Sequence, residues 1–135
     1  MQSKTDLQRR LNNVRREITD TTALINGLNE QLAEVKEAQR TLVQIQGWTD
    51  DDRCALNILE CCNCQCWKGS TQGRCENSHS HSVDLARNYS VKQDWLMEDL
   101  VAAEARFSSE LQQQTSHLGV LNNTRQQLII SISKL

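Results

Sequence analysis

Proline is absent from this sequence of 135 residues, and large aromatic side chains are few: three Trp, one Tyr and one Phe. Proline is the strongest helix breaker, so its absence permits long uninterrupted helices. Because aromatic side chains are scarce, a chain of this composition buries a narrow apolar stripe more easily than a round core. The composition therefore favours long helices over a compact globular core.

Charge of one sign does not dominate either. Fifteen Lys and Arg are dispersed among 17 Asp and Glu, which gives a net charge of −2. A nucleic-acid-binding protein usually concentrates its basic residues on one surface. The one basic cluster comprises Arg9, Arg10, Arg15 and Arg16, and acidic residues follow it at once. We interpret it as a solvated helix face and expect no nucleic-acid partner.

Long apolar runs are also lacking. The first ten residues do not contain the apolar stretch of a signal peptide. No segment approaches the roughly 18 apolar residues that a bilayer-spanning helix needs. We therefore expect a chain that is cytoplasmic when made, does not insert into a membrane and, if secreted, is exported without a cleaved signal peptide.

The first third of the sequence contains a heptad pattern, in which spacings of four and three residues alternate for more than five repeats. The pattern predicts a helix, arm 1, over about residues 3–46. Its core positions, named the first seam, are Leu7, Leu11, Val14, Ile18, Thr21, Ile25, Leu28, Leu32, Val35, Gln39 and Leu42.

The last third repeats the pattern less strictly and predicts a second helix, arm 2, over about residues 83–135. Two successive steps of four residues around Phe107 indicate a stutter that loosens the supercoil. Polar Gln114 and Arg125 argue against a self-sufficient dimeric zipper. The second seam comprises Leu96, Leu100, Ala103, Phe107, Leu111, Gln114, Leu118, Leu121, Arg125, Leu128, Ile132 and Leu135.

Two seams of similar length predict an all-α fold, an antiparallel two-helix hairpin resembling a coiled coil, in a single domain. The alternative is a parallel homodimeric coiled coil built from each arm separately. A two-helix hairpin covers only one face of each helix, so it tends to recruit further helices. We therefore expect the seams to bind a partner as well, at Leu11, Ile18, Ile25, Leu28, Leu32, Leu100, Phe107, Leu118, Leu121 and Leu128.

Residues 47–82 differ in kind and are expected to form a Cys-rich connector of short helical and loop segments. Thr49 can cap a new helix, and the acidic run after it suits the positive end of that helix. His79 and His81 are expected to be exposed in a Ser-rich polar loop. All six cysteines lie between Cys54 and Cys75.

Three interpretations of the cysteines compete. Cys64, Cys66, Cys75 and His79 could bind zinc, but the Cys-x-Cys and His-x-His spacings are poor for a structural zinc site. An even number of cysteines permits disulfides in an oxidising compartment. Free cysteines also commonly serve as small apolar fillers. The last two interpretations are favoured equally, and we expect neither a bound metal nor another cofactor.

Trp67-Lys68-Gly69 lies halfway along the chain, between the two arms. Glycine permits backbone conformations that a Cβ forbids, and an indole can fill the gap between helix ends. With this turn, and from Ser70 through Tyr89 and Trp95 into the leucine-rich arm 2, the chain resembles the WXG-motif helical hairpins of bacterial type VII secretion. It is most similar to the small proteins encoded beside LXG toxins.

The resemblance implies a bacterial accessory or targeting protein that is not an enzyme. Trp67 and Gly69 would form the turn, and the partner would be the helical N-terminal domain of an LXG toxin or a second small hairpin, in a hetero-oligomer. A C-terminal Tyr-x3-Asp/Glu export signal is missing from the sequence, so export is expected to depend on the partner. Catalytic motifs are missing as well. The alternative is a zinc- or disulfide-stabilised coiled-coil scaffold or tether.

Overall fold

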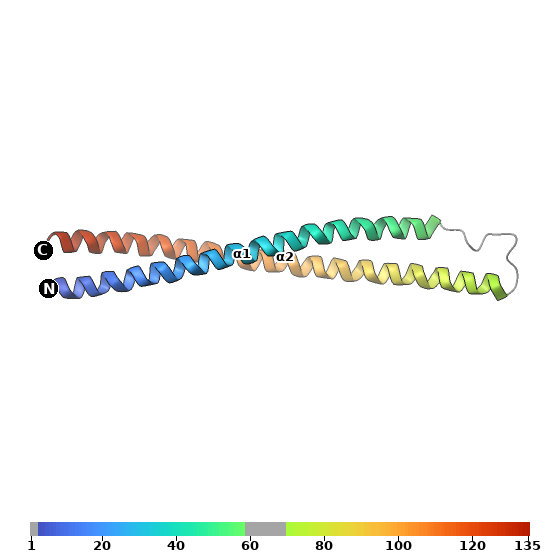
Figure 1. Ribbon diagram of the computed structural model, residues 1–135, viewed down its shortest axis with the longest axis horizontal. Coiled ribbons are helices and arrows are strands. Elements are labelled where there is room, and N and C mark those ends of the chain that lie inside the picture. Colours follow the sequence, from blue (N-terminus) through green and yellow to red (C-terminus); the bar gives the residue numbers. More distant parts are fainter. Residues whose placement is uncertain (1–2, 59–69) are drawn as a thin grey trace. The chain divides into compact units, whose positions relative to one another are not determined.

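A computed structural model describes residues 3–58 and 70–135 of the chain. It contains two helices, α1 at Lys4–Ile58 and α2 at Ser70–Ser133, and no strand within these residues (Figure 1). Leu7 and Leu11 of α1 pack with Leu128 of α2, so the start of one helix lies beside the end of the other. The predicted all-α antiparallel hairpin is confirmed. The predicted turn residues Trp67 and Gly69 lie outside the described residues.

The helices are longer than the predicted arms, and the predicted limits of the connector, residues 47–82, are wrong. Helix α1 continues through Gly47 and Thr49 to Ile58, and α2 already begins at Ser70. Thr49 does not cap a new helix, because its Oγ1 donates a hydrogen bond to the carbonyl oxygen of Ile45 at 3.0 Å, inside α1. Gly47 costs about 1 kcal/mol of helix propensity, but the core positions on both sides of it keep the helix continuous.

The first seam is confirmed along its whole predicted length. Every one of its positions is buried or half-buried, whereas its neighbours up to residue 44 are exposed, apart from Gly27. The same spacing then continues past the predicted arm through Gln46, Thr49, Arg53 and Leu56, which are also buried or half-buried. The heptad therefore extends to the last turns of α1, although these added positions are mostly polar.

The second seam differs from its prediction at its start and at Leu135, which is 68% exposed. Leu96 is 51% exposed, and the half-buried positions of this part are Met97, Leu100, Ala103, Glu104 and Phe107. Met97, Leu100, Glu104, Phe107 and Leu111 alternate spacings of three and four residues, so the seam continues without the predicted stutter, and Ala103 lies beside it. A continuous helix holds its phase against the neighbouring helix, and here that phase places Glu104 in the core while Leu96 points outward.

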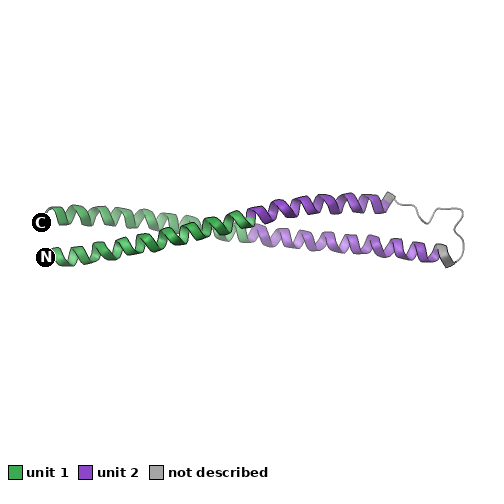
Figure 2. Cartoon of the chain, in the orientation of Figure 1, with its two compact units in different colours: residues 1–35, 103–135 green, residues 36–102 purple. Residues whose placement is uncertain are grey.

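The chain divides into two compact units (Figure 2). Unit 1 comprises residues 1–35 and 103–135, and unit 2 comprises residues 36–102. In unit 1, Leu7, Leu11 and Leu128 form a core on which Val14 and Ile132 pack. Among the described residues no side chain is less than 2% exposed, so the core is a narrow stripe, as the composition predicts.

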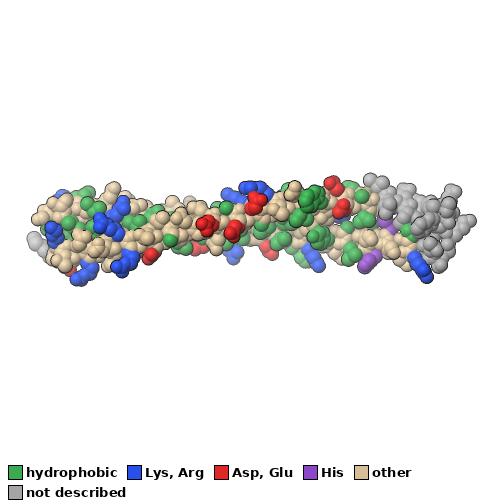
Figure 3. Space-filling view, in the orientation of Figure 1, with side chains coloured by type: hydrophobic (Ala, Val, Ile, Leu, Met, Phe, Trp, Pro, Cys, Tyr) green, Lys and Arg blue, Asp and Glu red, His purple; other side chains and the backbone are tan. Residues whose placement is uncertain are grey.

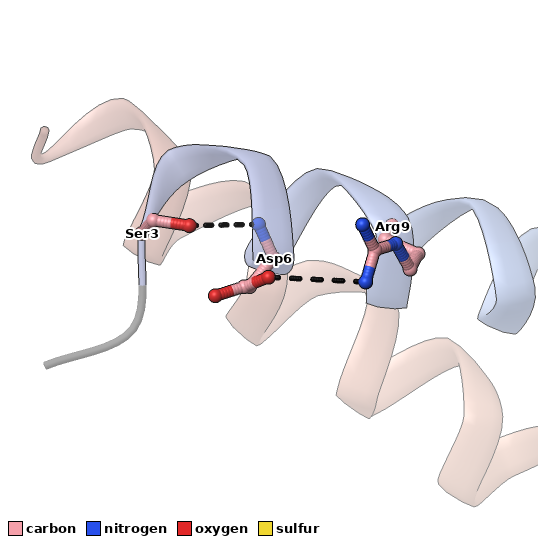
Figure 4. Close-up of polar contacts among 3 residues, drawn as sticks. All are labelled: Ser3, Asp6 and Arg9. Carbon is pink, nitrogen blue, oxygen red and sulfur yellow. Dashed lines mark hydrogen bonds and ion pairs between the residues drawn. The ribbon is translucent and has the colours of Figure 1, made fainter.

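Helix α1 begins with a polar cap that the sequence analysis did not identify (Figure 4). The backbone N–H of Asp6 donates a hydrogen bond to Ser3 Oγ at 3.2 Å. The Asp6 carboxylate also lies 4.0 Å from Arg9 Nη1. A serine before the first turn and an acidic side chain within it are both favourable at the positive end of a helix.

Candidate interaction surface

The seam residues that were expected to bind a partner line the interior of the hairpin itself. Leu11, Leu28, Leu121 and Leu128 are only 4–6% exposed. The others are half-buried, namely Ile18, Ile25, Leu32, Leu100, Phe107 and Leu118. A partner that docks on the folded hairpin must therefore contact other residues first, and the partner-binding role of the seam stays a prediction.

Unit 2 carries a group of apolar side chains that neither of its own helices covers. Figure 3 shows hydrophobic side chains of both helices exposed on this part of the molecule. Exposed apolar groups of this number commonly mark protein interfaces. The side chains that are at least 40% exposed are Val43, Trp48, Leu85, Tyr89, Val91, Trp95, Leu96 and Val101.

Several of these side chains share one side of unit 2. On α2, Tyr89 and Leu96 each lie one residue before a half-buried core position, Ser90 and Met97. On α1, Ile45 likewise lies one residue before the core position Gln46. In an antiparallel helix pair, such flanking positions of both helices lie on the same side of the seam. Trp48 is one turn from Ile45, and Leu85 is one turn from Tyr89. We name Ile45, Trp48, Leu85, Tyr89 and Leu96 the aromatic face.

A polar layer lies beneath the aromatic face. Gln93 is 5% exposed, Thr49 is 8% exposed, and Gln93 Nε2 donates a hydrogen bond to Thr49 Oγ1 at 2.8 Å. The Oε1 atom of the same Gln93 is buried without a hydrogen-bond partner. A buried polar pair of this kind specifies the alignment of two helices at a cost in stability.

Two further bonds connect the helices of unit 2 near this layer. Gln46 Nε2 donates to Asp94 Oδ1 at 3.3 Å, and Arg53 Nη1 donates to Ser90 Oγ at 3.3 Å. Together with Thr49 and Gln93 they give unit 2 a definite register. The positions of Trp48 and Leu96 on one side of the pair follow from this register.

No protein-family model, curated protein or solved structure matches this chain. The resemblance to the WXG-motif hairpins stays a prediction from the sequence. Neither helix contains a stretch that is long and apolar enough to cross a bilayer within the described residues.

The expected exposure of His79 in a loop is wrong, because this residue is half-buried on α2. Its Nε2 bonds to the carbonyl oxygen of Leu56, which can only accept, so the ring donates. Leu56 belongs to the last turn of α1, where carbonyl groups lack partners within the helix. His79 of α2 thus caps the end of α1. His81, by contrast, is exposed.

We expect His79→Ala to lower the free energy of unfolding by about 1 kcal/mol, because the Leu56 carbonyl loses its donor. The matched control is His81→Ala, which removes an exposed imidazole from the same helix and should change stability by less than about 0.5 kcal/mol. Urea denaturation followed by circular dichroism measures both variants. Equal stabilities would show that the cap contributes nothing.

The structure describes only two of the four residues considered for a zinc site. Cys64 and Cys66 lie outside the described residues. Cys75 is half-buried, and His79 already uses Nε2 for Leu56. Residues 3–58 and 70–135 hold no cluster of three or more potential metal ligands. Cys54 is an exposed free thiol.

Proposed function

We propose that this chain is a non-catalytic binding protein that docks a helix of another protein on its aromatic face. The carrying observation is the exposure of Trp48, Tyr89 and Leu96, at 59%, 57% and 51%. Within the resemblance to WXG-motif hairpins, the partner is the helical N-terminal domain of an LXG toxin or a second small hairpin. The chain then acts as an accessory subunit that supports export of the complex.

The physical basis is the incomplete burial of a two-helix fold. Two helices cover each other along one stripe only, so the remaining apolar side chains keep their contact with water. A third helix laid along the aromatic face removes Trp48, Tyr89 and Leu96 from water together. Trp and Tyr are the residue types that most often dominate the binding energy of such interfaces.

The charges around the aromatic face indicate the kind of helix that fits. Exposed Asp52 and Asp99 each lie one residue before a core position, on the side of the aromatic face. Exposed Lys92 lies on the same side, one turn from both Tyr89 and Leu96. No ion pair described for the chain involves these side chains. An amphipathic helix that carries Lys or Arg opposite Asp52 and Asp99, and an acidic side chain opposite Lys92, complements these charges.

The decisive experiment compares Trp48→Asp with Val120→Asp. We expect Trp48→Asp to weaken binding to the helical N-terminal domain of the LXG toxin that this proposal names as partner by roughly 30-fold or more, as for a central aromatic anchor. Val120 is 61% exposed in unit 1, so Val120→Asp introduces the same charge at similar exposure outside the face. Isothermal titration calorimetry gives both affinities, and circular dichroism verifies that both variants fold.

The same variants test the role in export. The amount of toxin in the culture medium should fall with Trp48→Asp and stay unchanged with Val120→Asp. Equal toxin affinities for the two variants would place the interface elsewhere. A stable homodimer in light scattering that does not bind the toxin domain would instead indicate a coiled-coil tether.

A further inference from the structure

The two ends of the chain form a strongly basic region when they come together in unit 1. Residues 3–16 and 125–135 contain seven Lys and Arg but one acidic residue, Asp6. The rest of unit 1, residues 17–35 and 103–124, contains one Arg and six Asp or Glu. We name residues 3–16 and 125–135 the basic end, and its cations are Lys4, Arg9, Arg10, Arg15, Arg16, Arg125 and Lys134.

The cations surround the solvent side of α1. Arg9 and Arg16 are seven residues apart and therefore share one side of the helix, opposite the seam. Arg10 and Arg15 occupy the two flanks, and all four side chains are exposed. The single acidic residue, Asp6, is already paired with Arg9 at 4.0 Å (Figure 4). Figure 3 shows Lys and Arg side chains gathered over this part of the molecule.

Exposed aliphatic side chains lie at the same end. Ile129, Ile130 and Leu135 are 43%, 52% and 68% exposed. Val14 packs on the cluster that contains Leu128. Arg15 directly follows Val14, and Ile129 directly follows Leu128. In an antiparallel pair these two positions therefore flank the same side of the seam. Arg15 and Ile129 thus lie on one side together, whereas Ile130, two residues after Leu128, points away from α1.

We propose that the basic end binds the surface of an anionic phospholipid bilayer. Lys and Arg interact with the negative lipid headgroups, while Ile129, on the same side as Arg15, enters the boundary between headgroups and acyl chains. Duplex DNA would attract the same cations but would gain nothing from exposed aliphatic side chains. A bilayer accounts for both features. This binding uses unit 1 and is independent of the aromatic face.

Sedimentation with lipid vesicles tests the proposal on the full chain. We expect binding to phosphatidylcholine vesicles that contain about 30% phosphatidylglycerol, at least about tenfold tighter than to phosphatidylcholine alone, and weakened by salt. Replacing the four arginines of α1 by Gln should lower the partition coefficient at least about tenfold. These substitutions are Arg9→Gln, Arg10→Gln, Arg15→Gln and Arg16→Gln.

A matched control removes the same number of charges from unit 2 and should keep vesicle binding within about twofold of the unmodified chain. Its substitutions are Lys36→Gln, Arg40→Gln, Arg87→Gln and Lys92→Gln. A further variant, Ile129→Gln, should weaken vesicle binding about tenfold. Circular dichroism confirms that each variant is as helical as the unmodified chain.

Three results would overturn the proposal. The first is equal binding to neutral and anionic vesicles, and the second is equal binding by the four-arginine variant and its unit 2 control. The third is tighter binding to duplex DNA than to anionic vesicles, with no effect of Ile129→Gln on vesicle binding. The toxin affinity of the four-arginine variant is measured in parallel, so that failure here is distinguishable from failure of the aromatic face.

Discussion

Leu11→Asp is expected to separate the two helices at the basic end and to lower the free energy of unfolding by about 3–5 kcal/mol. Leu11 is 4% exposed and belongs to the core cluster with Leu7 and Leu128. The substitution removes a buried apolar side chain and places an unpaired carboxylate in its position. Because the core is a single narrow stripe, few other contacts hold this end of the hairpin together.

The control for this prediction is Leu24→Asp. Leu24 lies on the same helix in unit 1 but is 44% exposed, so the same change in helix propensity occurs without the loss of a buried contact. We expect a cost of about 1 kcal/mol or less. Urea denaturation monitored by circular dichroism gives both values. Similar costs for the two substitutions would show that Leu11 is not part of a core in solution.

In the polar layer of unit 2, a second substitution is expected to restore the stability that a single substitution removes. Thr49→Val should destabilise the chain by about 1–3 kcal/mol, because the buried Gln93 Nε2 loses its acceptor. Gln93 Oε1 has no hydrogen-bond partner even in the unmodified chain. The double variant Thr49→Val with Gln93→Leu buries no unpaired amide. It should be as stable as the unmodified chain or more stable.

A double-mutant cycle tests this prediction. The four free energies of unfolding come from urea denaturation of the unmodified chain, both single variants and the double variant. We expect the effects of Thr49→Val and Gln93→Leu to deviate from additivity by about 0.5–3 kcal/mol, as for residues in direct contact. Additive effects would mean that the hydrogen bond at 2.8 Å does not couple the two side chains in solution.

The heptad spacing predicted most of the fold because it is a local property of the sequence. Every position of the first seam, from Leu7 to Leu42, is buried or half-buried in the structure. The prediction failed where apolar character and helix phase disagree. Leu96 is apolar but exposed, because the helix phase set by Leu100 and Phe107 places Met97 in the core instead. Hydropathy alone does not reveal the phase of a continuous helix.

The limits of the helices were underestimated for a related reason. Thr49 and the acidic run after it are typical of the start of a new helix, and the polar segment before Val83 is typical of a loop. Contacts between the helices override these local preferences. Thr49 accepts a hydrogen bond from Gln93, and His79 caps the Leu56 carbonyl. Both bonds join residues that are more than 20 positions apart in the sequence.

The candidate interaction surface required knowledge of which helix covers which residue. The sequence marks Leu28 and Trp48 equally as apolar, but only the packed structure shows that Leu28 is 4% exposed and Trp48 is 59% exposed. Seam leucines such as Leu121 were therefore expected to bind a partner, although the hairpin itself covers them. Trp48 was assigned to the connector, residues 47–82, in which Thr49 was expected to cap a new helix.

The sequence by itself determined that the chain forms two long helices with one apolar stripe each, because a repeat of three and four residues places those side chains on one side of a helix regardless of what lies nearby. The tertiary structure decided the rest, since antiparallel pairing joins residues from opposite ends of the chain. That pairing placed Arg15 on the same side of the pair as Ile129, and it positioned Trp48 and Leu96 on a common side. Neither juxtaposition can be deduced from local spacing or from a net charge of −2.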